Sequence, residues 1–210
     1  MTNILIADDH AIVRRGLRQI VATSADIAVI AEAADGAEVI DKLRRNPIDL
    51  LLLDMNMPGL SGLDLIARVR IEWPTLGILV LSMHNEAQVA SRALKAGASG
   101  YITKDSDPDV LMTAIRKVAQ GGRFIDPSLV DAIVFRAHNA GDEPPHEILS
   151  NREYQVLQRL AAGESINDIA RTLSLSAKTI STHKVRLMRK LGLDTNIDLA
   201  RYAIKHSVAQ

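Results

Sequence analysis

The strongest constraint on the fold is an almost wholly apolar run at residues 48–54 (IDLLLLD), which ends on Asp54. A strand with one face in water alternates apolar and polar residues, whereas a run this apolar is typical of a strand buried on both faces of a parallel sheet. The residues that follow, MNMPGLSG, contain two turn signals that end the strand. Asp54 is therefore predicted at the carboxyl end of a central strand, where open α/β sheets bind their ligands.

Strand and helix patterns alternate through the first 120 residues, which predicts an α/β domain with a parallel sheet and helices on both faces. The predicted strands are 3–7, 27–33, 48–54, 77–82 and 99–103, and the predicted helices are 11–23, 36–45, 61–72, 86–96 and 108–120.

The rest of the chain has a different organisation. Asp126-Pro127-Ser128 has the form of a helix start, and the polar, acidic, Pro-rich stretch 138–148 is predicted to be a linker. From Ser150 the pattern is helical, with predicted helices that end near residues 162, 173, 191 and 206. We therefore expect a first domain over 1–122, a linker with a helix over 123–148, and an all-α domain over 149–210.

Polar and charged residues end four of the predicted strands: Asp8 and Asp9, Asp54, Ser82, and Lys104. The carboxyl ends of parallel strands meet at one edge of the sheet, so we expect these side chains to converge. Clustered carboxylates repel each other unless a cation joins them, and oxygen ligands suit Mg²⁺. A lysine and a hydroxyl beside such a carboxylate suit a transferable phosphoryl group.

The C-terminal segment 150–210 is basic, with ten Lys and Arg against five Asp and Glu, although the whole chain has a net charge of zero. This asymmetry points to nucleic acid as a partner of that segment. A short helix, a turn and a longer helix form a helix-turn-helix pattern whose predicted apolar core is Ile169, Leu173, Leu175, Ile180, Val185, Leu187 and Leu191. The longer helix combines short polar side chains with Lys and Arg and has no acid, the mixture that reads a major groove.

The strand-end residues resemble the receiver domain of bacterial two-component response regulators over roughly residues 1–120. This resemblance implies a flavodoxin-like strand order 2-1-3-4-5 and phosphorylation of Asp54 by a sensor histidine kinase. It also implies that Asp8, Asp9, Asp54 and the backbone carbonyl of Asn56 hold Mg²⁺. Ser82 and Tyr101 are the implied switch residues, and Lys104 pairs with the phosphoryl oxygens.

Residues 149–206 are similar to the LuxR/NarL four-helix DNA-binding domain, on the pieces LSNREYQVLQRLAAG, INDIARTLSLSAKTISTHK and RKLGLDTN. The resemblance implies a NarL/FixJ response regulator that binds double-stranded DNA as a homodimer when phosphorylated, with RNA polymerase as a further candidate partner. It places Ser181, Thr182 and Val185 at bases with His183 and Lys184 nearby. It places Lys178, Thr179, Arg186 and Arg189 at the DNA backbone.

Two alternatives belong to other classes of protein. An aspartate-nucleophile phosphatase has a second aspartate two residues after the nucleophile as its acid/base, and this chain has Asn56 there, so we expect a regulator and not an enzyme. A ligand-gated LuxR-type regulator shares the C-terminal domain, but its sensory half is an aromatic-rich pocket without strand-end acids, and this chain is 3% aromatic.

The remaining features are expected to be unremarkable. We expect Tyr101 to be a partly buried aromatic at the sheet edge, and His10 to be a rim residue without metal-ligand neighbours. No stretch has the length of a membrane span and the N-terminus enters a strand pattern at once, so we expect neither a membrane segment nor a signal peptide. The absence of cysteine excludes disulfides, and all of this fits a cytoplasmic protein.

Overall fold

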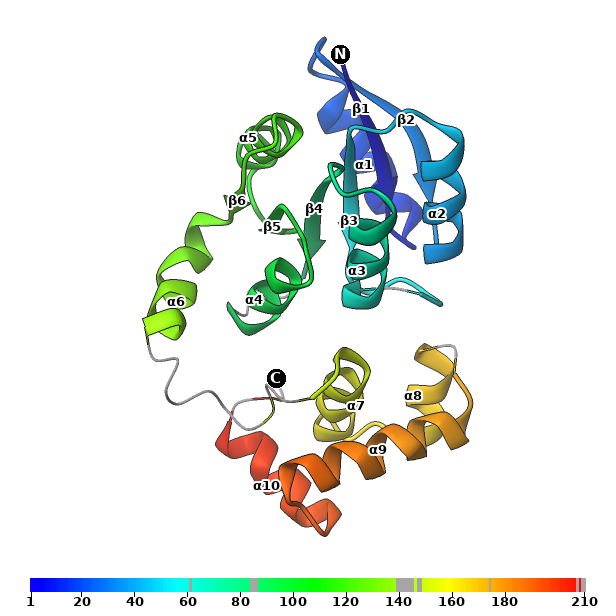
Figure 1. Cartoon of the computed structure of the whole chain (residues 1–210), viewed down its shortest axis with the longest axis vertical. Coiled ribbons are helices and arrows are strands. Elements are labelled where there is room, and N and C mark those ends of the chain that lie inside the picture. Colours follow the sequence, from blue (N-terminus) through cyan, green and yellow to red (C-terminus); the bar gives the residue numbers. More distant parts are fainter. Residues whose placement is uncertain are drawn as a thin grey trace. The chain divides into compact units, whose positions relative to one another are not determined.

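A computed structural model describes residues 1–60, 62–83, 87–138, 146, 149–173, 175–206 and 208. The chain divides into two compact units, Met1–His138 and Asn139–Gln210, which are described separately (Figure 1). The predicted helix starts at residues 61 and 86 lie outside the described residues, as does most of the predicted linker 138–148.

The first unit is built on a parallel sheet in the order β2-β1-β3-β4-β5-β6, which confirms the predicted 2-1-3-4-5 order and adds a sixth strand. Its strands are β1 (Thr2–Ala7), β2 (Ile27–Ala33), β3 (Leu50–Asp54), β4 (Gly77–Ser82), β5 (Gly100–Thr103) and β6 (Phe124–Ile125). The central strand begins at Leu50 and not at residue 48, because the Ile48 amide bonds the Asn46 carbonyl instead of entering the ladder.

Helices cover both faces of this sheet: α1 (Ala11–Val21), α2 (Gly36–Arg45), α3 (Gly62–Glu72), α4 (Ala87–Lys95), α5 (Pro108–Ala119) and α6 (Pro127–His138). Leu50 and Leu52 lie in one apolar core with α1 and α5, whereas Leu51 and Leu53 lie in the other with α2, α3 and α4. All four leucines are fully buried. The apolar run at β3 therefore lies between two layers of helices, as its composition predicts.

The expectation that Tyr101 is a partly buried edge residue is wrong. Tyr101 has 0% exposure, because β6 pairs with β5 and places Ile125 beside Tyr101. The next element, α6, adds Leu129 to the same core and packs against α4. A two-residue strand has too few positions to show a hydrophobic pattern, so the sequence does not reveal that β5 has a further neighbour.

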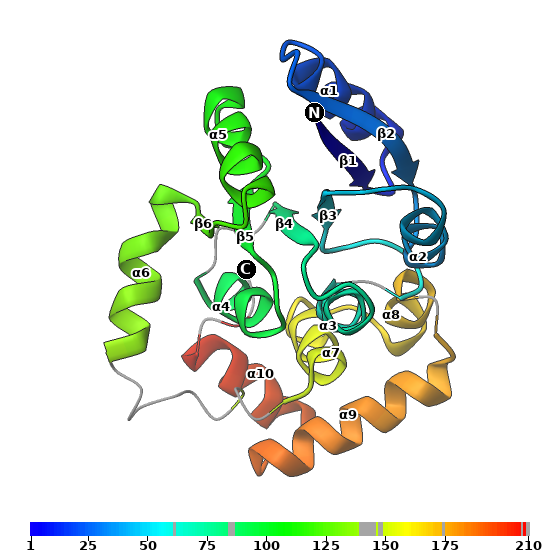
Figure 2. The ribbon, with the colours of Figure 1, turned by 45° about the horizontal axis from the view of Figure 1, so that its top comes forward.

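The second unit consists of α7 (Asn151–Ala161), α8 (Ile166–Thr172), α9 (Ala177–Leu191) and α10 (Asn196–Lys205) in its described part. Ser150 and Glu153 form a capping box at the start of α7. Thr195 caps α10. Gly192 ends α9 with a left-handed backbone at φ 65°. Figure 2 shows α9 as a long helix beside α7 and α8, which both pack against it.

The predicted core of the helix-turn-helix is confirmed except at one position. Ile169, Ile180 and Leu187 are buried at its centre, and Leu173, Leu175 and Leu191 pack around them. Val185 is 67% exposed and does not belong to this core. It lies on the outer face of α9, because helical geometry turns it away from Ile180 and Leu187. None of the helices in the described part of the chain is long and apolar enough to span a membrane.

One substitution tests how closely α2 packs on the loop after Asp54. A Cβ at Gly36 would lie 1.7 Å from the backbone oxygen of Leu60, so one of the two segments must shift. We expect Gly36→Ala to lower the free energy of unfolding by roughly 1–3 kcal/mol, the usual range for overpacking. Urea unfolding followed by the fluorescence of Trp73, the chain's single tryptophan, measures this in the first unit.

Gly16→Ala is the matched control, because a Cβ there has no heavy atom within 4 Å. A helix prefers alanine to glycine by about 1 kcal/mol, so this variant should be slightly more stable than wild type. Wild-type stability of Gly36→Ala would contradict the packing of α2 against this loop.

Candidate functional site

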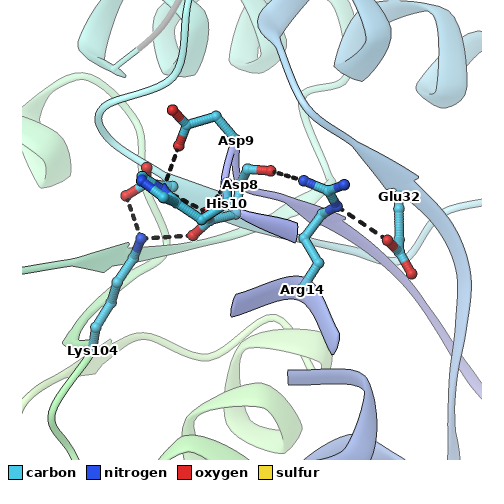
Figure 3. A network of polar contacts seen from close by, with 7 residues as sticks. Asp8, Asp9, His10, Arg14, Glu32 and Lys104 are labelled. Carbon is cyan, nitrogen blue, oxygen red and sulfur yellow. Dashed lines mark hydrogen bonds and ion pairs between the residues drawn. The ribbon is translucent and has the colours of Figure 1, made fainter. Parts of the chain in front are cut away.

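The ends of three strands bring two carboxylates and one ammonium into direct contact. The Nζ atom of Lys104, directly after β5, lies 2.6 Å from Oδ2 of Asp8, which follows β1. The same Nζ lies 3.0 Å from Oδ1 of Asp54, the last residue of β3. Figure 3 shows the Lys104 side chain extending toward Asp8. The structure thus places together three of the residues that the strand-end pattern predicts.

Burial makes these charges depend on one another. Asp8 has 0% exposure and Asp54 has 3%, so neither carboxylate is well hydrated. Burial raises the pKa of Asp54, Lys104 opposes this shift, and the Asp8 charge adds to it. For Lys104, burial lowers the pKa, but the hydrogen bonds and charges of Asp8 and Asp54 outweigh burial and the net pKa is raised. Lys104 is therefore held as an ammonium between two acids.

A third carboxylate lies at the same corner of the sheet. Oδ1 of Asp9 is buried, and it lies 2.8 Å from Nδ1 of His10. The amide of His10 donates to Oδ1 of Asp8 at 2.8 Å. Potential ligand atoms of Asp8, Asp9 and His10 all lie within 4.8 Å of one another. The expectation that His10 has no metal-ligand neighbours is therefore wrong, although its side chain is 70% exposed at the rim, as expected.

This set of donors fits a hard divalent cation. Lys104 pairs with Asp8 and Asp54, and Asp9 lies against the imidazole of His10, so three carboxyl groups meet one lysine ammonium and one histidine in the described part of this corner. The buried Oδ1 of Asp9 lies against only the imidazole of His10 among the described residues, and that imidazole is 70% exposed. Oxygen ligands and excess negative charge are what Mg²⁺ prefers, whereas a soft metal would need sulfur or several imidazoles.

The other predicted residues of this edge lie on or near the same strand ends. Ser82 ends β4 with 0% exposure, and its carbonyl accepts the amide of Lys104 at 2.8 Å. Asn56 is exposed in the loop after β3, and its backbone N–H donates to the Asp54 carboxylate. Tyr101 lies in the apolar core two residues before Thr103. The strand-end pattern thus locates all of these residues at the carboxyl edge or in the strand that leads to it.

Sequence reasoning missed a supporting contact that involves α1 and β2. Nη1 of Arg14 donates to the backbone oxygen of Asp8 at 2.6 Å, and its Nε donates to Glu32 at 3.1 Å (Figure 3). Arg18 of α1 pairs with the same Glu32. These contacts hold the end of β1 in place. They join residues 6 to 18 positions apart, for which the sequence contains no spacing rule.

The second unit presents one exposed face of α9. Lys178, Thr182, Val185, Arg186 and Arg189 are exposed there, at the intervals expected for one side of a helix, and Thr179, Ser181, His183 and Lys184 are partly buried. The hydroxyls of Ser181 and Thr182 donate to the carbonyls of Ala177 and Lys178, each at 2.9 Å. Their oxygens are therefore left as acceptors on this surface.

An ion pair fixes α9 against α7. Nζ of Lys190 lies 2.7 Å from Oε2 of Glu153, the same carboxylate that completes the capping box with Ser150. Burial opposes ionisation of Glu153, but the bonds from Lys190 and Ser150 leave its pKa lowered. This contact sets the angle at which the exposed face of α9 is held.

Comparison with known proteins matches both units to family models. Residues 4–116 match the response regulator receiver domain, and residues 147–203 match the LuxR family of bacterial regulatory proteins. The response regulator UvrY of Escherichia coli is 32% identical over 209 residues, covering 99% of this chain and 96% of UvrY. The oxygen regulatory protein NreC of Staphylococcus epidermidis is 38% identical over 215 residues, covering 99% of both chains.

Solved structures agree with these matches. RcsB of Salmonella enterica serovar Typhimurium, bound to the P1flhDC promoter with the phosphomimetic BeF3-, has a TM-score of 0.68 and 31% identity, covering 96% of this chain and 97% of RcsB. The chain belongs to the NarL/FixJ-type response regulators, in which a receiver domain is followed by a LuxR-type DNA-binding domain.

Proposed function

We propose that Asp54 accepts a phosphoryl group from a sensor histidine kinase and that this modification controls binding to double-stranded DNA. The observation that carries the proposal is the contact of Lys104 with both Asp54 and Asp8 at one edge of the sheet. A buried carboxylate that pairs with a lysine is suited to accept a phosphoryl group, because the lysine ammonium compensates the added negative charge.

The transfer leaves the protein with an acyl phosphate. A carboxylate oxygen of Asp54 forms a bond to phosphorus while the bond from phosphorus to the kinase imidazole breaks, and the imidazole leaves with that electron pair. Lys104 stays within reach of the phosphoryl oxygens, because its Nζ already lies 3.0 Å from the Asp54 carboxylate. Ser82, at the end of the neighbouring strand β4, is proposed as the switch hydroxyl, and Tyr101 as the aromatic residue that responds with it.

Mg²⁺ is the proposed cofactor, held by Asp8, Asp9, Asp54 and the backbone carbonyl of Asn56. When bound, the ion neutralises the phosphoryl oxygens during transfer. Asn56 is an amide and does not transfer protons at neutral pH, so this site lacks the acid/base of an aspartate-nucleophile phosphatase. The match of residues 4–116 to a receiver domain also opposes a ligand-gated sensory half.

The proposed DNA contacts follow the exposed face of α9. Ser181, Thr182 and Val185 are proposed to meet base edges, with His183 and Lys184 nearby. Lys178, Thr179, Arg186 and Arg189 are proposed to meet phosphates. Because RcsB has been described as two dimers bound to two parallel DNAs, a homodimer on DNA is the proposed assembly.

The proposed domain boundaries are residues 1–122 for the receiver, 123–148 for a linker with a helix, and 149–210 for the DNA-binding domain. RNA polymerase is a further proposed partner. The cytoplasm is the proposed location, because the DNA-binding domain needs access to the chromosome.

The first prediction for this function concerns the acceptor. Incubation with Mg²⁺ and acetyl phosphate should add one phosphoryl group to the wild-type protein, and Asp54→Asn should gain none. Intact-mass measurement decides this. Asp64→Asn, which changes an acid of α3 away from the strand ends, is the control and should be labelled normally. Full labelling of Asp54→Asn would remove Asp54 as the acceptor.

A second prediction concerns the metal. Asp9→Asn should lose most Mg²⁺-dependent labelling, while its stability without metal should equal or exceed that of wild type. The substitution relieves repulsion from Asp8 and Asp54, and the contact that it weakens, between Oδ1 of Asp9 and Nδ1 of His10, involves a largely exposed imidazole. Thermal unfolding with and without Mg²⁺ measures both effects. A marked loss of stability without metal would mean that Asp9 is structural instead.

The third prediction concerns DNA. Two half-sites about 10 base pairs apart place both α9 helices on the same side of the duplex. Lys178→Ala should weaken binding to all sequences alike and reduce the slope of log affinity against log salt by about one. Thr182→Ala should change base preference, because its hydroxyl oxygen accepts hydrogen bonds while its methyl can meet thymine.

Two controls make this test specific. Thr182→Val keeps the methyl and replaces the hydroxyl with a second methyl, so it removes the acceptor together with the bond to the Lys178 carbonyl. Lys42→Ala removes one positive charge from α2 of the receiver. Binding titrations against a randomised duplex pool at several salt concentrations give both preference and slope. The placement of α9 in the groove would be wrong if Lys178→Ala altered base preference while Thr182→Ala left it unchanged.

A further inference from the structure

Asp126 is a buried carboxylate between β6 and α6 whose two oxygens bind different parts of the receiver. It is 4% exposed. Oδ2 accepts hydrogen bonds from the backbone amide of Thr103 at 3.3 Å, from the Thr103 hydroxyl at 3.2 Å and from the Ser106 hydroxyl at 2.5 Å. Thr103 and Ser106 flank Lys104, so this oxygen closes the loop that carries the lysine.

The other oxygen holds the start of α6. Oδ1 accepts the backbone amide of Ser128 at 3.0 Å and the Ser128 hydroxyl at 2.6 Å. The Asp126 amide donates to the carbonyl of Tyr101 at 2.9 Å, which ties the same residue to β5. Burial alone would raise the pKa of Asp126, but the Ser106, Ser128 and Thr103 donors lower it to about 2. The Asp126 carboxylate is therefore ionised over the whole pH range in which proteins function.

Lys104 and α6 are thus joined through one side chain. The amide of Lys104 bonds Ser82 at the end of β4, and its ammonium bonds Asp8 and Asp54. From α6, Leu129 enters the core that contains Tyr101 and the α4 residue Ala90, and α6 packs against α4. In sequence, α6 is the last helix of the first unit before the chain continues to the DNA-binding unit.

We propose that Asp126 couples the chemical state of Asp54 to α6 by binding the Lys104 loop with one oxygen and the start of α6 with the other. The proposal rests on the proposed phosphorylation of Asp54. A phosphoryl group on Asp54 gives Lys104 new oxygens to pair with, so its position relative to Asp8 must change. When Lys104 moves, the loop 103–106 moves with it. The start of α6 then moves with the loop, because the Asp126 carboxylate binds both.

A carboxylate that only caps a helix would stabilise α6 equally in both states of Asp54. A coupling residue instead makes α6 respond to phosphorylation. The distinguishing measurement is therefore the change in amide hydrogen exchange across residues 127–138 when full-length protein is labelled with acetyl phosphate and Mg²⁺, and not the exchange of either state alone.

The test compares four proteins: wild type, Asp126→Asn, Ser128→Ala and the control Asp131→Asn. Asp131 is an exposed acid of α6, so its variant makes the same chemical change on the same helix. In wild type and Asp131→Asn, labelling should change α6 exchange by about threefold or more, within the range of local opening equilibria. In both Asp126→Asn and Ser128→Ala, Asp54 should still be labelled. The change in α6 exchange should be lost in Asp126→Asn and smaller than in wild type in Ser128→Ala, which keeps the backbone bond to Oδ1.

Ser128→Ala keeps the carboxylate and the backbone bond to Oδ1 and removes only the hydroxyl bond, so it tests the idea even if Asp126→Asn fails to fold. A wild-type response in labelled Ser128→Ala and Asp126→Asn would overturn the coupling, as would a labelled wild type whose α6 exchange does not change. Absence of label on wild type would instead refute the phosphorylation itself, and the coupling would fall with it.

Discussion

The pairing of Lys104 with Asp8 and Asp54 is the interaction on which the receiver site depends. Without the ammonium, buried carboxylates at adjacent strand ends would repel each other and would be driven to protonate. With it, the ammonium offsets part of the rise that burial causes in the pKa of Asp54. The fold provides this arrangement because parallel strands end at one edge, and because the leucines of β3 anchor Asp54 between two helical layers.

The two units solve different physical problems. The receiver concentrates charge on buried groups, where a small chemical change has a large electrostatic effect. The helical unit spreads positive charge over the exposed face of α9, the face proposed to contact DNA, where charges act in water. The second unit also contains a buried charge, the Glu153 carboxylate, which both caps α7 and binds Lys190 of α9. The orientation of the exposed face therefore depends on a buried contact.

Much of this architecture is predictable from the sequence, since strand ends, caps and apolar periodicity are local signals. Asp8, Asp54, Ser82 and Lys104 follow apolar runs, and Ser150 and Gly192 bracket helices as their chemistry requires. What escaped prediction depends on distant contacts. β6 is too short for a pattern, so the burial of Tyr101 and the role of Asp126 were hidden. Val185 satisfies an apolar spacing but faces outward, because the periodicity of a helix does not fix which apolar residue its neighbours cover.

The central claim is that Asp54, among three neighbouring acids, is the residue that carries the phosphoryl group. Borohydride converts an aspartyl phosphate to homoserine and leaves unmodified aspartate unchanged, so peptide mapping after reduction locates the acceptor directly. After labelling with acetyl phosphate and Mg²⁺, homoserine should be found at position 54, in the tryptic peptide 46–68. Homoserine at Asp8 or Asp9, in the N-terminal peptide 1–14, would contradict the account.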